Sequence, residues 1–323
     1  MKVAELLAKR RQNWSQLESL CTRLERPRRG RLGAALMVRF AALYRAACAD
    51  LALADAYQLP PNTVGYLHQL VGRAHNQLYR TQGFRLAAWW QEMLVELPRR
   101  LLGDRVLHLA FCLFWGFFFG SMLLGYASQG FAESLLGEET LRMMEEMHSH
   151  SVGGRDIDSG VAAVGGYVQH NTSIGLQCFA FGLTVVMGLY VLVFNAVLLG
   201  TVFGHMITTP QRDNFFQFVT AHGPFELTAI VLSAAAGLKM GFSLIDTGGW
   251  SRGASLRRAT REALPTACLA MIGFVLAAVI EGLISPSALP YVVKLGVAVA
   301  STVVLVIYFV LLGSRWRPRR ATG

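Results

Sequence analysis

The sequence predicts an all-α protein, a polytopic membrane helix bundle of about six membrane segments with an N-terminal cytoplasmic helical bundle. Three observations predict this class. Of the 323 residues, 53% are hydrophobic and only 15% are charged, against roughly 25% charged residues in soluble domains. Apolar runs of membrane length recur after residue 105. Residues 1–105 hold 17 Lys and Arg against 8 Asp and Glu, so most of the net charge of +10 lies in the first third.

Residues 1–100 are expected to form a basic cytoplasmic region of four amphipathic helices. Apolar residues recur at helical spacing in four stretches, 3–24, 36–51, 64–78 and 84–97. The turn-forming sequences RPRRG, LPPN and TQG separate them. The basic segment ERPRRGR could contact nucleic acid or anionic lipid. Because no aromatic residues interleave with it, we expect a solvated turn beside the membrane and no nucleic-acid partner.

The opening sequence MKVAELLAKRRQNW has a charge every few residues and lacks the apolar core of a secretory signal peptide. The five cysteines form no CxxC pair and have apolar or helix-forming neighbours. We therefore expect buried thiols rather than disulfide bonds or zinc sites.

Residues 101–313 are expected to form the membrane domain. Three segments have the length and composition of single spans, 106–127, 264–284 and 291–313. The loop 128–170 holds seven Asp and Glu against two Arg, so it is expected outside the cytoplasm. The loop 244–263 and the tail 314–323 are basic, and both are expected on the cytoplasmic side.

This charge pattern requires an odd number of crossings between residues 170 and 250. The apolar run 172–206 would be about 52 Å long as one helix, which is too long for one ordinary crossing. Two short helices broken near MGLY (187–190), followed by a span over 222–242, give six crossings with both termini inside. The alternative is one long or tilted helix over 172–206 followed by a re-entrant hairpin over 215–243.

Three GxxxG sequences occur in these segments, GFFFG at 116–120, GTVFG at 200–204 and GLKMG at 237–241. Small residues four positions apart let helix backbones approach closely. We therefore assign a structural role to the glycines of the last two sequences, which are Gly200, Gly204, Gly237 and Gly241. Packing within the chain is the favoured interpretation, and a homodimer interface is the alternative.

Polar side chains inside apolar segments are the candidate functional residues, because such groups are costly in lipid and need a partner or water. They are Asn195, His222, Glu226, Lys239 and Glu281. Lys239, near the far end of its segment, is expected to extend toward the inner headgroups.

The segment AHGPFELTAIVLSAAAGLKMG opens with several polar residues, and this opening indicates a helix start at the membrane boundary. Pro224 after Gly223 suits the first helical turn, so both are expected to be structural. Glu226 then lies where a carboxylate can accept from free backbone N–H groups. We expect His222 and Glu226 at the outer face, with Glu281 from the next span as their partner.

Three segments of the chain, NAVLLGTVFG (195–204), HGPFELTAIVLSAAAGLKMG (222–241) and IEGLISP (280–286), resemble the stage II sporulation protein M family of bacterial and archaeal membrane proteins. The resemblance covers roughly residues 100–313. It departs at Ala196, where the family usually has Asn-Gly, so a sharp turn is not implied there. The resemblance implies a bacterial plasma-membrane protein.

In spore formers the family's namesake acts in engulfment, with peptidoglycan-degrading partners. Other members are often encoded near MoxR-type ATPases and RDD-type membrane proteins. A membrane scaffold or anchor that organises a cell-envelope complex is therefore the favoured function. The scaffold would contact lipid, other membrane or envelope proteins and, through residues 1–100, a cytoplasmic ATPase or other docking partner.

Two other functions stay open. One is a transporter or channel with a polar path lined by the five candidate residues. The other is an intramembrane enzyme using His222 with Glu226 or Glu281. No GxSxG, HExxH or P-loop motif occurs, so we expect no catalytic residues, cofactor or metal. His148 and His150 could bind a metal, but two histidines in an acidic loop are expected to be solvated.

Overall fold

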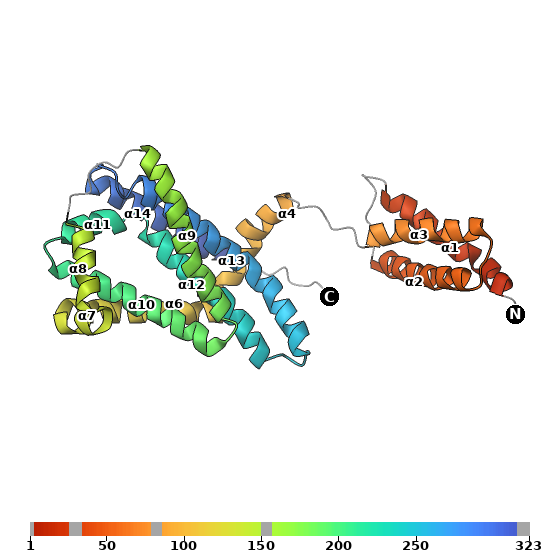
Figure 1. The fold of residues 1–323 in the computed structure, drawn as a ribbon, viewed down its shortest axis with the longest axis horizontal. Coiled ribbons are helices and arrows are strands. Elements are labelled where there is room, and N and C mark those ends of the chain that lie inside the picture. The colour runs from red at the N-terminus through yellow and green to blue at the C-terminus, as the bar shows by residue number, and fades with distance from the viewer. Residues whose placement is uncertain (1–2, 26–33, 79–85, 150–156, 315–323) are drawn as a thin grey trace. The chain divides into compact units, whose positions relative to one another are not determined.

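The computed structural model describes residues 3–25, 34–78, 86–149 and 157–314 (Figure 1). These residues form helices and no strand, which confirms the all-α prediction. The chain divides into two compact units, residues 1–85 and residues 86–323, called unit 1 and unit 2 below.

The described part of unit 1 is a bundle of three helices, α1 (Val3–Glu25), α2 (Ala34–Ala56) and α3 (Pro61–Leu78). Trp14 of α1 packs with Phe40 of α2 and Leu67 of α3 in a core of its own. Asp50 is fully buried beside this core. Its carboxylate accepts a hydrogen bond from the Trp14 indole at 2.8 Å and pairs with Arg10, so the buried charge is satisfied.

The structure differs from the prediction of four helices within residues 1–100. The fourth stretch forms α4 (Leu86–Gln91), the π-helical segment η1 (Glu92–Glu96) and α5 (Leu97–Leu102), all within unit 2. Met93 and Leu97 are buried in the core of unit 2, and the Tyr308 hydroxyl donates to the Met93 carbonyl at 2.6 Å. Periodicity shows that a helix buries one face, but it does not identify the partner.

The remaining elements of unit 2 are α6 (Arg105–Ala127), α7 (Gln129–Leu136), α8 (Glu138–Met147), α9 (Ile157–Phe181), α10 (Val185–Thr208), α11 (Arg212–Val219), α12 (Gly223–Ile245), α13 (Arg252–Leu283), α14 (Tyr291–Val306) and η2 (Ile307–Leu312). Within the described residues, five helices are long and apolar enough to cross a membrane, namely α6, α10, α12, α13 and α14 with η2. Unit 2 is therefore a multi-pass membrane bundle, as predicted.

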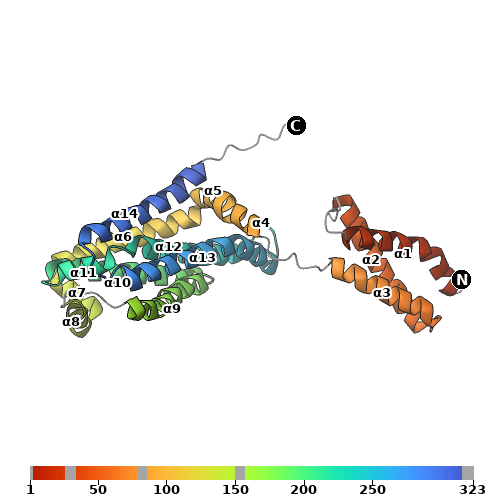
Figure 2. The same cartoon turned by 90° about the horizontal axis from the view of Figure 1, so that it is seen from above.

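Helix α9 is a sixth long helix of this bundle, with 25 residues, and it is not among the five that are apolar enough to cross a membrane. It packs antiparallel to α13, because Gly160 near its start contacts Gly282 and Gly175 lies against Phe274. The long helices lie along one another in Figure 2. Helix α9 thus lies along the second half of α13 within the bundle.

The apolar run 172–206 is two helices, as the favoured interpretation predicted, but the break lies at Gly182–Thr184 instead of 187–190. At this point the backbone of Gly182 lies against the backbone of Gly237 in α12, with no room for a side chain. The chain therefore reverses where a glycine permits close contact. The alternative of one long helix followed by a re-entrant hairpin is wrong.

Two segments predicted as loops are largely helical. Residues 128–170 contain α7, α8 and the first half of α9, and residues 244–263 contain the start of α13. The Ser251 hydroxyl accepts from the backbone N–H of Ala254 at 3.4 Å and caps α13. Alanine, leucine and arginine favour helix in water as well as in lipid. Hydropathy therefore marks the end of the apolar segment and not the end of the helix.

Glycines bring two helix pairs into backbone contact. A Cβ added to Gly200 or Gly204 of α10 would collide with backbone carbonyls of α6. One added to Gly237 or Gly241 of α12 would collide with backbone carbonyls of α9 and of the turn that follows it. Both glycines of GFFFG (116–120) have no such neighbour within 4 Å. Two of the three GxxxG sequences therefore serve packing within the chain.

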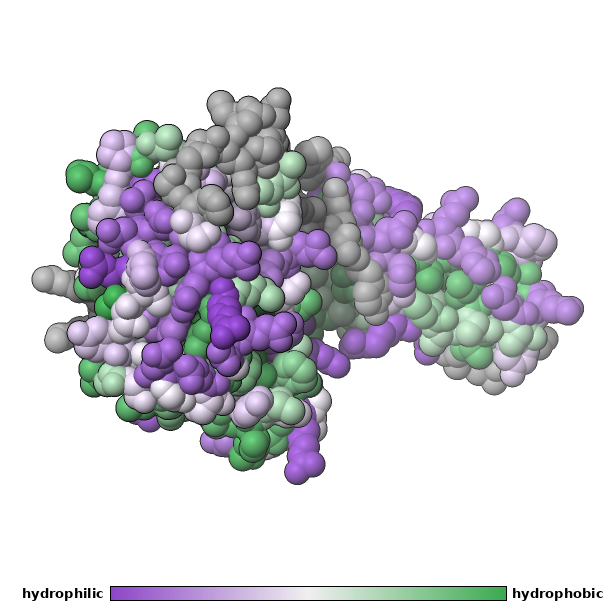
Figure 3. All heavy atoms as spheres, turned by 60° about the vertical axis from the view of Figure 1, so that its left-hand side comes forward, coloured by the Kyte–Doolittle hydropathy of each residue, from purple (hydrophilic) through white to green (hydrophobic). Residues whose placement is uncertain are grey.

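The bundle has an acidic end and a basic end. The acidic end is formed by α7, α8 and α11, where Met144 and Phe215 pack against Met206 of α10. Figure 3 shows hydrophilic residues gathered on one face of the molecule with hydrophobic residues at its flanks. The basic end holds the starts of α6 and α13, with Arg252 and Arg257 on α13. The basic tail 314–323 lies outside the described residues except for Ser314.

Candidate functional site

Helix α12 begins at Gly223 at the acidic end, with Pro224 in its first turn, which confirms the predicted helix start. The carbonyl of His222, the N-cap residue, accepts from the backbone N–H groups of Phe225 and Glu226, both at 3.2 Å. Gly223 was expected to be structural, yet a Cβ there would meet nothing within 4 Å. The start therefore rests on Pro224, whose fixed φ suits the first turn.

The ring of His222 is buried and contacts three groups. Its Nδ1 lies 2.9 Å from the Ser285 hydroxyl, and its Nε2 lies 3.5 Å from a carboxylate oxygen of Glu226. The Phe218 ring packs edge-on against it, with centroids 5.6 Å apart. Positions four apart share a helix face. The first turn of α12 therefore directs His222 and Glu226 to the same place.

Glu281 of α13 lies beside this pair. One ligand-type atom from each of His222, Glu226 and Glu281 lies within 4.8 Å of the others. The Glu281 carboxylate also accepts from the side-chain amide of Asn171 at 3.1 Å, and Asn171 of α9 is buried. Below, "the polar cluster" means these four residues and Ser285. The structure thus brings together the three residues that the sequence placed at the outer face.

Lys294 of α14 is a fully buried cation next to the polar cluster. Its ammonium donates to the Ser285 carbonyl at 2.7 Å, while the Ser285 hydroxyl contacts His222. Lys294, Ser285 and Asn171 were not among the residues predicted from the sequence. A lysine inside the run 291–313 was an available signal for the first. The other two lie near the ends of apolar runs, where polar residues are ordinary and give no signal.

Lys239 and Asn195 lie away from the polar cluster. Lys239 is about 25 Å along α12 from His222, and its ammonium donates to the Asp104 carboxylate at 3.0 Å. It is held inside the protein at the basic end instead of extending to headgroups. The Asn195 amide donates to the Val191 carbonyl of its own helix at 2.8 Å. The five predicted residues therefore lie in three places.

Two other histidines of the acidic end have local partners. His148 Nδ1 lies 2.8 Å from the Met144 carbonyl, and His205 Nε2 lies 2.8 Å from a carboxylate oxygen of Glu145. His150 lies outside the described residues. Within the part of the chain that the structure describes, only the group in the polar cluster brings three metal-binding side chains together.

One large cavity of unit 2 is apolar. Its volume is about 710 Å³, and it lies between α6, α12 and α14, with Phe111, Trp115, Leu227 and Phe309 among its lining residues. No member of the polar cluster lines it. A lining of this kind suits lipid acyl chains and not a polar solute.

Comparison with known families decides what kind of protein this is. A family model described as stage II sporulation protein M matches residues 109–286. The chain belongs to the stage II sporulation protein M family. The match covers more than half of this family member and contains the whole polar cluster, whereas Lys294 lies beyond it.

Unit 1 of this stage II sporulation protein M family member has a match of its own. Residues 4–80 match a second family model, described as a domain of unknown function (DUF8413). No curated protein and no solved structure matches the chain.

Proposed function

We propose that this stage II sporulation protein M family member is a scaffold of the bacterial cell envelope. Unit 2 anchors it in the plasma membrane, and unit 1 docks a cytoplasmic partner. The observation that carries this proposal is the division of the chain into two units with separate hydrophobic cores. A compact helical unit joined to a membrane bundle suits the recruitment of a soluble protein to the membrane.

The charge of unit 1 supports a docking role. Residues 1–85 hold 14 Lys and Arg against 5 Asp and Glu. Arg39 and Arg45 of α2 are exposed. A basic surface of this kind attracts an acidic protein surface and steers its approach. The resemblance to the family suggests a MoxR-type ATPase as the partner.

The interior of unit 2 supports an anchor better than a transporter. Its glycine contacts join α10 to α6 and α12 to α9 backbone to backbone, which favours one fixed packing. A transport path needs a continuous polar lining. Asn195 and Lys239 instead bond to groups remote from the polar cluster, and the large cavity is apolar.

The distribution of charge supports an orientation with both termini in the cytoplasm. Arginines at the basic end, such as Arg257 and Arg261 on α13, favour the cytoplasmic side. The acidic end would then face the envelope outside the membrane. Partners that remodel peptidoglycan, as implied by the family's namesake, would meet α7 and α8 there.

Co-purification from the native host tests the scaffold proposal. The MoxR-type ATPase of that host is expected to copurify with the tagged full chain and to be lost when residues 1–85 are removed. The double variant Arg39→Glu and Arg45→Glu should weaken the interaction. The matched charge change Glu138→Lys and Glu139→Lys, at the acidic end, should leave it intact.

The outcomes separate the parts of this proposal. Equal recovery of the ATPase with residues 86–323 alone would assign docking to unit 2 and contradict the role of unit 1. If neither the ATPase nor an envelope protein copurifies with the full chain, the scaffold function is wrong.

A further inference from the structure

The side chains of the polar cluster have the composition of a metal site. His222 and Glu226 come from one face of α12, and Glu281 comes from α13. One potential ligand atom from each lies within 4.8 Å of the other two. Ligands at about 2.1 Å from a tetrahedral zinc ion lie about 3.4 Å apart. His222 Nε2 and Glu226 Oε2, which lie 3.5 Å apart, already have about this spacing.

The outer partners of these ligands are those that a metal site requires. A histidine that binds metal through one ring nitrogen usually donates from the other, which fixes its tautomer and orientation. His222 Nδ1 lies 2.9 Å from the Ser285 hydroxyl, which leaves Nε2 facing Glu226. The Glu281 carboxylate is oriented by the Asn171 amide at 3.1 Å. Ser285 therefore orients the His222 ring, and Asn171 orients the Glu281 carboxylate.

The two carboxylates lack a cationic side chain of their own. Among the described residues, neither Glu226 nor Glu281 forms an ion pair with a lysine or arginine. Lys294 is buried nearby, but its ammonium donates to the Ser285 carbonyl and pairs with no carboxylate of the described residues. Two carboxylates within one partly buried site repel each other and are poorly solvated. A divalent cation between them removes both costs.

We propose that His222, Glu226 and Glu281 bind a divalent transition-metal ion, with Zn²⁺ as the best match. One imidazole nitrogen with two carboxylate oxygens suits Zn²⁺, Mn²⁺ or Fe²⁺ better than Ca²⁺ or Mg²⁺, which prefer oxygen alone. Three protein ligands leave a coordination position for water or another molecule. No metal was expected from the sequence, because Glu281 lies 55 residues after Glu226 and the three ligands match no short motif.

This inference is independent of the scaffold proposal, since a scaffold needs no metal. The ion would join α12 to α13 at the acidic end, while Asn171 ties α9 to the same point. A metal that binds only the folded protein stabilises it by mass action. The site would then fix the relative positions of three helices near the surface that meets envelope partners.

Metal binding by the purified full chain in detergent tests the proposal. The protein is stripped with EDTA, dialysed, and titrated with Zn²⁺ and separately with Mn²⁺ by isothermal calorimetry, with bound metal measured by mass spectrometry. We expect one ion per chain. Asn171→Ala, which removes only an outer partner, should weaken binding by about 10–100-fold. Glu226→Gln and Glu281→Gln, which keep the side-chain shape, should abolish it.

A matched control is Glu145→Gln. It removes a carboxylate that also pairs with a buried histidine, His205, but without a third ligand. This variant should bind metal like the wild type. Thermal melting of each metal-free variant verifies that it is folded. The proposal is overturned if the stripped wild type binds neither ion, or if Glu226→Gln and Glu281→Gln bind as tightly as the wild type.

Discussion

The carboxylate of Asp104 joins the start of α6 to the far end of α12. One oxygen accepts from the backbone N–H of Val106 at 2.9 Å and caps α6, and the other accepts from the Lys239 ammonium at 3.0 Å. The two side chains are mostly buried, with 13% and 27% of their surface exposed. A lysine that composition alone assigns to lipid headgroups is thus a structural link between two helices.

Replacing Lys239 by methionine should lower the stability of the membrane unit. The change keeps the length and apolar stem of the side chain and removes the bond to Asp104. Asp104→Ala should cost more, because it removes both the pair and the helix cap. A lost cap costs about 1 kcal/mol, and an unpaired buried polar group about 1–3 kcal/mol. Thermal unfolding in detergent measures both changes.

The control for this comparison is Arg142→Ala. Arg142 pairs with Glu138 on α8, but both side chains are largely exposed, so the change should shift stability by less than about 1 kcal/mol. An unchanged melting temperature for Lys239→Met would mean that Lys239 extends to the headgroups after all.

Gly200→Val should destabilise the bundle far more than Gly116→Val. A side chain at position 200 would collide with the backbone carbonyl of Phe118, whereas position 116 has open space around its Cα. Forcing α10 away from α6 should cost about 1–3 kcal/mol. The melting temperatures and yields of the two variants in detergent test this difference. Equal effects would argue that close packing of α6 and α10 does not hold the bundle together.

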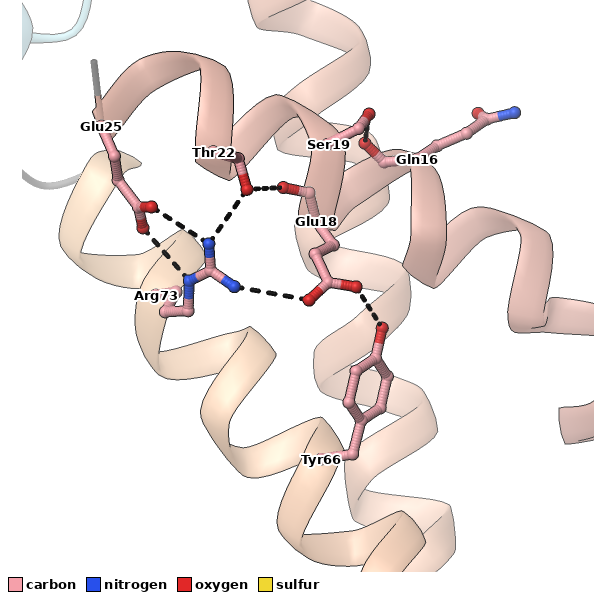
Figure 4. Close-up of polar contacts among 7 residues, drawn as sticks. All are labelled: Gln16, Glu18, Ser19, Thr22, Glu25, Tyr66 and Arg73. Atoms are coloured by element: carbon pink, nitrogen blue, oxygen red, sulfur yellow. Dashed lines mark hydrogen bonds and ion pairs between the residues drawn. The ribbon is translucent and has the colours of Figure 1, made fainter.

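The stability of unit 1 should decrease in acid through Glu25 and Arg73. Arg73 donates to the Glu25 carboxylate, to Glu18 and to Thr22 (Figure 4). The hydrogen bonds from Arg73 hold the pKa of Glu25 below its usual value of 4.5. A lowered folded-state pKa contributes stability that is complete above the usual value and is lost as the pH falls through the folded-state value.

Circular dichroism of residues 1–85 measures this effect. The spectrum should be helix-dominated, and a strand-rich spectrum would contradict the three-helix fold. Urea unfolding at neutral and acidic pH should show less pH dependence in Glu25→Gln than in the wild type. Both side chains are more than one-third exposed, so the pair should contribute less than about 1 kcal/mol and weaken in salt.

The sequence predicted the membrane bundle well where one local signal decides an element. Pro224 after Gly223 marked the start of α12, and the length of the run 172–206 required a break. The break was misplaced because Gly182 is used for a contact with α12 that no local pattern reveals. The helical stretch after residue 84 was assigned to the wrong unit for the same reason, since its partner is remote in the chain.

The candidate site was only partly predictable. His222, Glu226 and Glu281 were noticed because ionisable residues are rare in apolar segments. Their grouping with Asn171 and Ser285 depends on α9 and on the turn after α13, whose positions follow from tertiary packing. The same rule also selected Lys239 as a candidate site residue, but Lys239 pairs with Asp104 at the basic end. Composition identifies a group that needs a partner, and the fold determines which partner it has.

Cysteine labelling should show that the acidic end lies outside the cytoplasm. The labelled sites are Glu139→Cys on α8 and Arg257→Cys on α13, in a chain whose natural cysteines are replaced. Both positions are exposed, unlike Ser255, which is buried and donates to the Ser243 carbonyl.

A membrane-impermeant maleimide added to intact cells should label position 139. Position 257 should react only after the membrane is permeabilised, because arginine-rich ends of membrane helices favour the cytoplasmic side. Helices α9, α10 and α12 lie between the two positions, so three crossings would put them on opposite sides and the two results should differ. Labelling of position 257 in intact cells would reverse the proposed orientation, and labelling of both would contradict the odd number of crossings between them.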